Sequence, residues 1–398
     1  MKRRINILPI LFLSLLFFLM NLYVLSGIEI IITNPATSLF FWTFIAGATA
    51  LLIYAIANIQ KLGMGMLFKL ASHLFLILFA SEILFIVLLL AGDAYRLIAG
   101  IPRSLIWVEI DLSLVGILVL LFIYGMVRGK YAYRVIKHTL YFEDLPSSFE
   151  GFTITQISDV HSGSFTNGKA VQRGIDMIKA QNSDVFVFTG DLVNNKAEEI
   201  KPWIKHFSQI KAPFGQFSIL GNHDYGDYVK WDTEENKSSN LQQLKTYHKD
   251  LGYKLLLDEH VELRKGNEKI ILAGVENWGI GFGERGDLKK ALKGTSNNDF
   301  KVLLSHDPSH WEAQVVNFHS KVQLTLSGHT HGMQFGIEAF GIKWSPVKYR
   351  YKHWAGVKLL NDRYLNVNRG FGFIGFSGRV GIWPEITVIE LKRKEGTS

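Results

Sequence analysis

Cysteine is absent from the 398 residues, which excludes disulfides, thiolate metal sites and a cysteine nucleophile. A strong charge of one sign is also missing, because 43 Lys and Arg residues stand against 35 Asp and Glu residues. After residue 127 the basic surplus is only six. Spread over a large domain, such a surplus does not support nucleic-acid binding. Because the chain has no cysteine, any catalytic or metal-binding site must use side chains other than thiols.

Long apolar runs dominate the first third of the chain. They cover Ile5–Ser26, Thr37–Ile59, Phe68–Ala91 and Ile106–Val127. Each has about the 20 residues that a helix needs to cross a hydrocarbon core of about 30 Å. The first run follows three basic residues, but it lacks a small-x-small cleavage site, so we expect an uncleaved helix and not a signal peptide. Residues 1–127 are thus predicted to form a module of four transmembrane helices.

The basic residues near the spans predict an orientation. They gather before the first span, in the second connection and after the fourth span, at Lys2, Arg3, Arg4, Lys61, Lys69, Arg128, Lys130, Arg134 and Lys137. The first connection has Glu29 and no basic residue, and in the third Asp93 stands against Arg96 and Arg103. The positive-inside rule therefore predicts that both termini and the soluble part are cytoplasmic.

Glu82 lies near the middle of the third span. An ionisable group at that depth is a functional candidate. The alternative is a protonated carboxyl group that is hydrogen-bonded to a neighbouring helix.

After residue 150 the pattern changes to strands alternating with amphipathic helices, which predicts an α/β domain over residues 151–398. A juxtamembrane linker with a first edge strand is expected over residues 128–150. The predicted strands are Phe152–Ile157, Val185–Thr189, Gln216–Leu220, Lys269–Val275, Lys301–Ser305, Val322–Ser327, Tyr364–Asn368 and Ile386–Leu391. The predicted helices are Gly168–Ala180, Ile200–Ile210, Asn240–Leu251, Leu288–Leu292 and His310–Asn317. The polar stretch Tyr225–Asn240 is predicted to be a loop.

Five short motifs follow predicted strands, where ligands of α/β sheets collect. They are Asp159-Val160-His161, Gly190-Asp191, Gly221-Asn222-His223-Asp224, Ser305-His306 and Gly328-His329-Thr330-His331. Carboxylate, imidazole and amide oxygen are ligands for divalent cations. Two such cations suit phosphoester hydrolysis, because one activates water while both neutralise developing charge. His223 could protonate a leaving oxygen, and Asp224 could orient its ring.

Each motif alone has a plainer explanation. A single Asp-x-His or Gly-Asp is common by chance, Gly-Asn is a turn signal, and one His after a strand is more often structural. The five together make coincidence improbable. The segment Gly163–Ala170 resembles a phosphate-binding loop, but Ala170 replaces the hydroxyl that would bind magnesium, so we expect a loop leading into a helix.

These motifs, in this order, resemble those of the calcineurin-like metallophosphoesterase superfamily, and in particular a membrane-anchored bacterial branch. The likeness extends to Arg369-Gly370-Phe371-Gly372, Arg379 and Trp383-Pro384-Glu385. It implies a pair of central β-sheets flanked by helices. It also implies a dinuclear site for manganese, iron, zinc or similar ions, with the first ion on Asp159, His161 and His331, the second on Asn222, His306 and His329, and Asp191 bridging.

The resulting hypothesis is a membrane-tethered phosphoesterase of the bacterial inner membrane. It would hydrolyse a phosphomonoester, phosphodiester or pyrophosphate bond, and a lipid-linked phosphate is one candidate substrate. The aromatic residues Trp231, Trp278, Phe282, Trp344 and Trp354 could line a lipid site or simply pack in the core. One alternative is a nuclease. Another is a transporter or sensor whose metallophosphoesterase domain is regulatory. The sequence leaves the oligomeric state open.

Overall fold

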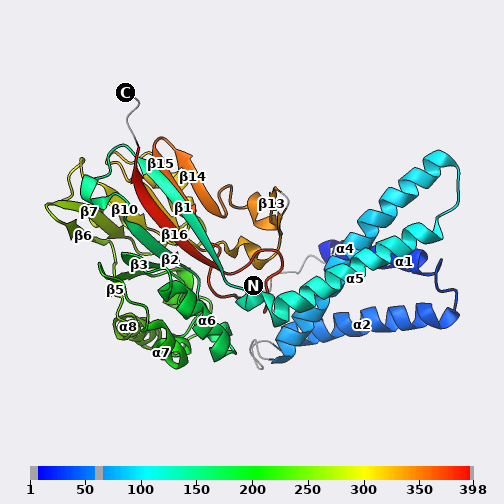
Figure 1. The fold of residues 1–398 in the computed structure, drawn as a ribbon. Coiled ribbons are helices and arrows are strands. Elements are labelled where there is room, and N and C mark those ends of the chain that lie inside the picture. Colours follow the sequence, from blue (N-terminus) through cyan, green and yellow to red (C-terminus); the bar gives the residue numbers. More distant parts are fainter. Residues whose placement is uncertain (1–7, 59–65, 340, 395–398) are drawn as a thin grey trace. The chain divides into compact units, whose positions relative to one another are not determined.

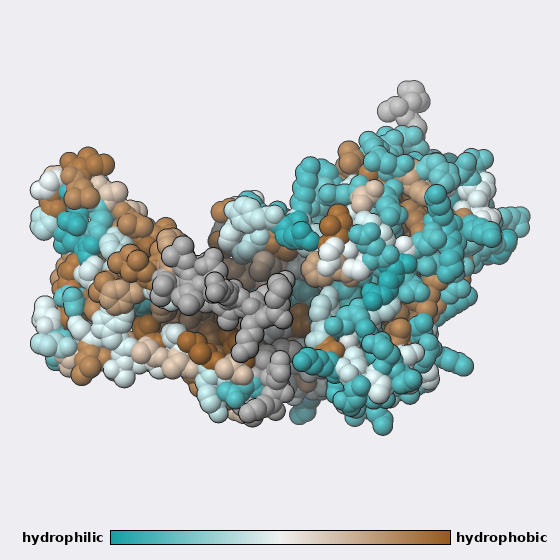
Figure 2. Space-filling view, turned by 180° about the vertical axis from the view of Figure 1, so that it is seen from behind, coloured by the Kyte–Doolittle hydropathy of each residue, from teal (hydrophilic) through white to brown (hydrophobic). Residues whose placement is uncertain are grey.

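The structure is a computed structural model that describes residues 8–58, 66–339 and 341–394. The chain forms two compact units, Met1–Tyr124 and Gly125–Ser398. Hydrophobic residues dominate the helices of the first unit, whereas the surface of the second is mainly hydrophilic (Figure 2). The proposed domain limits at residues 127 and 150 remain a prediction.

The apolar runs form helices. These are α1 (Leu8–Ile28), α2 (Pro35–Ala57), α4 (Met66–Ala99) and α5 (Leu105–Val127). By length and composition α2, α4 and α5 could each cross a membrane. The apolar part of α1 within the described residues, Phe12–Ile28, is shorter. Lys2, Arg3, Arg4, Ile59 and Lys61, on which part of the prediction depends, lie outside the described residues.

The most connected polar side chain in the first unit is that of Asp93. Asp93 at the end of α4 forms ion pairs with Arg96 (2.7 Å) and with Arg103, and it accepts a hydrogen bond from the hydroxyl of Tyr23 (2.7 Å). The two arginines of the third connection therefore share one carboxylate. Glu82 is buried, and its Oε2 has no hydrogen-bond partner among the described residues.

Two six-stranded sheets form the centre of the second unit (Figure 1). The first has the order β1 (Arg134–Phe142), β16 (Glu385–Arg393), β2 (Thr153–Ile157), β3 (Val185–Thr189), β4 (Gln216–Ile219) and β5 (Lys254–Leu255). The second has the order β14 (Gly356–Leu360), β15 (Arg363–Val367), β11 (Leu324–Ser327), β10 (Lys301–Leu304), β7 (Glu268–Gly274) and β6 (Glu259–Lys265). Strands β2, β3 and β4 run parallel, and so do β10 and β11. Their carboxyl ends therefore meet at one edge of each sheet.

The two sheets pack face to face. One apolar cluster takes side chains from both, among them Ile154 and Val187 of the first sheet and Leu272, Leu304 and Leu326 of the second. β3 and β10 are buried along their whole length, as expected of parallel strands that are covered on both faces. The expected α/β fold with a core of two sheets is confirmed.

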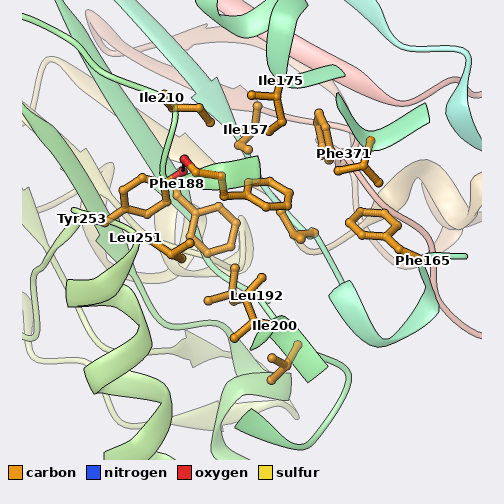
Figure 3. Packing of buried hydrophobic residues seen from close by; sticks show 14 of the residues in the cluster. Ile157, Phe165, Ile175, Phe188, Leu192, Ile200, Ile210, Leu251, Tyr253 and Phe371 are labelled. Atoms are coloured by element: carbon orange, nitrogen blue, oxygen red, sulfur yellow. Dashed lines mark hydrogen bonds between the residues drawn. The ribbon is translucent and has the colours of Figure 1, made fainter. Parts of the chain in front are cut away.

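Helices cover the outer faces of the sheets. α6 (Gly168–Lys179), α7 (Ile204–Phe207) and α8 (Glu234–Asp250) pack on the first sheet, where Ile157, Ile175, Phe188, Leu251 and Phe371 share one core (Figure 3). α6 begins where Asn167 accepts a hydrogen bond from the backbone of Ala170, which confirms the loop-to-helix interpretation of Gly163–Ala170. On the second sheet, α9 (Leu288–Ala291) and the short helix Trp311–Val315 pack over a smaller core.

One prediction about the fold is wrong. Tyr225–Asn240 is not a loop throughout, because α8 already begins at Glu234. Thr233 caps it by accepting the backbone N–H of Asn236, and Glu234 and Glu235 stabilise the first turn through the helix dipole. The start of α8 could not be recognised from its polar sequence, because only Leu244 and His248 of this helix are buried.

Candidate metal centre

The predicted ligands lie at the carboxyl ends of adjacent strands. Asp159 and His161 follow β2, Asp191 follows β3 and Asn222 follows β4, while His306 follows β10 and His329 and His331 follow β11. Five of them have a left-handed backbone, with φ of 52° at Asp159, 46° at His161, 63° at Asp191, 70° at His329 and 50° at His331. A non-glycine residue is costly there, and such residues cluster at active sites.

Asp159, His161 and His331 form one buried group whose ligand atoms all lie within 4.8 Å of one another. The Nε2 atoms of His161 and His331 are 3.0 Å apart, and Nε2 of His331 is 3.2 Å from Oδ1 of Asp159. Three groups with lone pairs thus converge on one point, as ligands of a cation do.

Asp191, His306 and His329 form the second group within the same limit. Nε2 of His306 is 3.2 Å from Oδ2 of Asp191, and Oδ1 of Asn222 is 2.9 Å from Nδ1 of His329. Oδ2 of Asp191 also lies 3.5 Å from Nε2 of His161 in the first group. Asp191 is therefore the carboxylate that joins the two groups.

Neighbouring groups fix which atom of each ligand faces the centre. Nδ1 of His306 donates to the carbonyl of Thr189 (2.7 Å), which leaves the lone pair on Nε2. The amide nitrogen of Asn222 donates to the hydroxyl of Tyr228 (2.8 Å), which leaves Oδ1 for the centre. Such outer partners orient metal ligands and raise their basicity.

Asp307 completes this outer layer, and the sequence analysis did not single it out. Its Oδ2 lies 3.3 Å from Nε2 of His329, which favours a proton on Nε2 and leaves Nδ1 facing Oδ1 of Asn222. Asp307 in turn accepts hydrogen bonds from the hydroxyl of Tyr351 (3.0 Å) and the backbone of Ser309 (2.8 Å). Its place directly after His306 was the available signal.

Opposite charges are coupled in the centre. Burial opposes charge on both Asp191 and His306, but their mutual attraction outweighs it. The pKa of Asp191 is therefore held well below its usual range, and that of His306 is raised to about 10. Burial lowers the pKa of His161 well below its ordinary value, so this ring stays neutral and its Nε2 can bind a metal.

Two glycines of the motifs are required by close packing. A Cβ at Gly328 would meet Oγ of Ser158 at 1.6 Å and Oδ2 of Asp159 at 2.4 Å. A Cβ at Gly221 would meet Oδ1 of Asp191 at 2.2 Å. Both glycines let one backbone approach a ligand carboxylate that comes from a different strand.

His223 lies beside the first group, with its ring centroid 5.0 Å from that of His161. Its Nδ1 donates to the carbonyl of Asn194 (2.8 Å), so Asn194, and not the expected Asp224, orients the ring. Asp224 instead accepts the backbone N–H groups of Asp191, Leu192, Val193 and Gly221, at distances from 2.8 to 3.2 Å. The correction has a simple cause, because buried backbone donors need acceptors.

Residues 369–385, which also belong to the family likeness, contact the backbone and a ligand of the centre. The backbone N–H groups of Phe371 and Gly372 donate to the carbonyls of Ser158 and Asp159 (2.7 and 2.8 Å). The fully buried guanidinium group of Arg379 donates to the carbonyl of Gly372 and lies 3.2 Å from Nδ1 of His331. This segment therefore fixes the backbone next to Asp159.

The donor set fits divalent cations. It consists of imidazole nitrogens, carboxylates and one amide oxygen, which together suit borderline and hard ions such as zinc, manganese and iron. Nε2 of His306 is buried and lies 3.2 Å from Oδ2 of Asp191, so these two atoms are placed to share one ion.

Comparisons with known proteins agree with this site. Residues 152–333 match the family model described as "Calcineurin-like phosphoesterase", and residues 3–130 match the one for the transmembrane domain of such phosphoesterases. The chain is 31% identical over 273 residues to the uncharacterized metallophosphoesterase YkuE of Bacillus subtilis, which covers 68% of this chain and 90% of that protein. It is 28% identical to an uncharacterized metallophosphoesterase of Aquifex aeolicus, over 66% of this chain and 94% of that protein.

The name of a vertebrate relative mentions both a transmembrane protein and a metallophosphoesterase domain. The chain is 28% identical to the "transmembrane protein with metallophosphoesterase domain" of Danio rerio, over 68% of this chain, and the match spans 60% of that protein. Together with the apolar helices, these likenesses identify an integral membrane protein with a hydrolase domain that uses divalent metals. The chain belongs to the calcineurin-like metallophosphoesterases that have a transmembrane domain.

Proposed function

We propose that this protein hydrolyses a phosphoester at a dinuclear metal centre. Asp159, His161 and His331 would hold one ion, Asn222, His306 and His329 the other, and Asp191 would bridge them. The observation that carries the proposal is the convergence of two buried ligand groups on either side of Asp191. Divalent ions in such a pair supply an activated water and neutralise the charge that develops on the phosphoryl group.

His223 is proposed as the general acid. Its Nδ1–H stays on the carbonyl of Asn194, so a second proton on Nε2 is the one available to the leaving oxygen. The ring also packs against Tyr228, with centroids 4.5 Å apart. A ring held in this way can deliver a proton along a fixed direction, as general acid catalysis requires.

The substrate is proposed to be a phosphate group attached to a lipid. Support comes from the membrane helices and from aromatic rings beside the metal ligands, since Phe282 and Tyr351 lie 4.6 and 5.4 Å from His329 between ring centroids. Trp278 and Trp354 are buried, which agrees with core packing. The positive-inside pattern supports a cytoplasmic location of the soluble domain, and the bacterial relatives support the inner membrane of a bacterium as the site of the proposed activity.

The test uses the full chain, purified in detergent and loaded separately with manganese, zinc or iron. p-Nitrophenyl phosphate and bis-p-nitrophenyl phosphate distinguish monoesterase from diesterase activity. The proposal predicts turnover that a chelator abolishes and that His306→Ala removes together with one of the two bound ions. A folded protein that binds two ions but hydrolyses neither ester nor a pyrophosphate would remove the hydrolytic proposal.

A further inference from the structure

A hairpin beside the metal centre exposes apolar side chains. It consists of β12 (Ile337–Ala339) and β13 (Ile342–Trp344), which pair antiparallel. Ile337 and Ile342 are 51% and 56% exposed, and Met333 before the hairpin and Tyr349 after it are 57% and 78% exposed. We call residues 333–339 and 341–352 the hairpin rim. A cluster of large apolar side chains that are exposed to water marks an interaction surface.

The hairpin rim is also basic. Its sequence holds Lys343, Lys348, Arg350 and Lys352 against one acidic residue, Glu338, which is ion-paired with Arg369. Lys348, Arg350 and Lys352 are exposed. Apolar side chains interleaved with Lys and Arg are typical of segments that insert into the headgroup region of an anionic bilayer.

Contacts inside the second unit connect this rim to the end of the last membrane helix. The carbonyl of Gly125, in the final turn of α5, accepts the backbone N–H of Arg379 (3.2 Å). The next residue, Val380, donates its N–H to the carbonyl of Gln334 (2.8 Å) and accepts that of Gly336 (3.0 Å). One short segment thus bonds both to the end of an apolar helix and to the backbone that leads into β12.

The end of α5 marks a membrane boundary in the chain. Its apolar run stops at Val127, and Arg128 and Lys130 follow at once. A backbone fixed to Gly125 through two consecutive residues must lie near that boundary. The backbone that leads into β12 therefore lies near Gly125 and the basic residues that follow α5 in the sequence.

The rim also borders the metal centre. Met333 is two residues from the ligand His331. Arg350 donates to the carbonyl of Ile280 (2.9 Å), whose side chain is itself half-exposed, and Tyr351 bonds to Asp307 behind His329. A bilayer surface in contact with this rim would therefore lie next to the metal centre.

We propose that the hairpin rim docks on the surface of an anionic lipid bilayer, with Met333, Ile337, Ile342 and Tyr349 entering the headgroup region. Lys348, Arg350 and Lys352 then pair with lipid phosphates. Docking itself does not require the proposed hydrolase activity. Its consequence, that the site receives phosphoesters from the bilayer surface, rests on the proposed function.

The absence of cysteine makes the test direct. Full-length protein with the single substitution Ile342→Cys is labelled with an environment-sensitive fluorophore and placed in nanodiscs of phosphatidylcholine and phosphatidylglycerol. A second set of nanodiscs has the same lipid mixture, with part of the phosphatidylcholine carrying a nitroxide near the headgroup. Leu360→Cys is the matched control, because Leu360 is an exposed aliphatic residue (45%) at the end of β14, on the same domain.

Docking predicts blue-shifted emission and severalfold stronger nitroxide quenching at position 342 than at position 360. The double substitution Lys348→Glu and Lys352→Glu should reduce the quenching at position 342, as should removal of phosphatidylglycerol. Equal quenching at both positions would overturn the proposal. A blue shift without quenching by the nitroxide lipid, together with cross-links between copies, would assign the rim to a second copy of the chain instead.

A functional readout separates docking from the proposed chemistry. Ile337→Ser with Ile342→Ser should leave hydrolysis of soluble bis-p-nitrophenyl phosphate unchanged. The same variant should lower, severalfold, the hydrolysis of hexadecyl p-nitrophenyl phosphate in vesicles. If the wild-type protein hydrolyses neither diester, a diesterase function fails, while the fluorescence result still decides docking.

Discussion

Asp307 lies beside the ring of His329, with 3.3 Å between Oδ2 of the carboxylate and Nε2 of the ring. This contact favours a proton on Nε2 of His329, because a carboxylate can only accept. Nδ1 is then the nitrogen that faces Asn222 and the second ligand group. The carboxylate contributes to the centre without being a ligand.

Replacing Asp307 tests this role. Asp307→Ala should weaken the binding of one of two metal ions by about 10–100-fold, the usual effect of losing an outer partner of a ligand. Tyr351→Phe removes only the hydroxyl that bonds to Asp307 and should have a smaller effect in the same direction. Metal content after dialysis against graded chelator measures both. If the Asp307→Ala variant retains both ions as well as the wild type does, Asp307 does not support the ligand His329.

His223→Gln tests the proposed general acid. The substitution should lower kcat by about 10²–10⁴-fold, the typical contribution of a positioned proton donor. Metal content should not change, because His223 is not among the ligand atoms that converge. The loss should be smaller for an ester whose leaving group needs no proton, such as p-nitrophenyl, than for an alkyl ester. His206→Gln, a histidine outside the centre that bonds to Gln172, is the control.

Asp224→Ala is expected to affect stability as well as activity. Four backbone donors, in Asp191, Leu192, Val193 and Gly221, would lose their acceptor, and each buried unpaired donor costs about 1–3 kcal/mol. The unfolding temperature of the full chain in detergent should therefore fall by several degrees. Asp227→Asn, at a partly exposed carboxylate with ion pairs to Lys237 and Arg285, should change it little. An unchanged unfolding temperature in Asp224→Ala would contradict the assignment.

Much of the fold could be predicted because local signals agreed with the tertiary structure. Short apolar runs predicted β3 and β10 to within one residue at each end. A strand that is buried on both faces is apolar throughout, so its sequence is easy to recognise. α8 was missed at its start because a helix with one narrow buried stripe looks like a polar loop. β12 and β13 were not predicted, because their exposed, mixed residues carry no alternating pattern.

The metal ligands could be predicted from order and spacing, but their partners could not. His306 and Asp191 each follow a strand, and parallel neighbours place strand ends together. The bond from His223 to the carbonyl of Asn194 has no sequence signal, since every residue has a carbonyl group. Asp224 likewise sits where a ring-orienting carboxylate would be expected, and only the backbone geometry shows that it binds N–H groups instead.

Glu82 provides a test of the membrane module. The side chain is buried in α4, and Oε2 makes no hydrogen bond within the described residues, which is costly for a carboxylate and marks functional positions in membrane helices. Glu82→Gln should leave the hydrolysis of soluble esters within about twofold of wild type. A large loss of that activity, with metal content intact, would instead connect α4 to catalysis.

The stability of the second unit should depend on pH through His248. Burial lowers the pKa of this ring to about 3, and Nδ1 bonds to the hydroxyl of Ser218 (2.9 Å). In the unfolded chain the ring has a pKa of about 6.5, so between these two values the unfolded state binds the extra proton. This contribution to stability is thus complete above about pH 6.5 and is lost as the pH falls toward 3. His248→Phe removes the titrating group but keeps a ring beside Phe188. Its unfolding temperature should fall less between pH 7 and pH 5 than that of the wild type. If both proteins lose the same number of degrees, His248 is not the group that couples folding to protons.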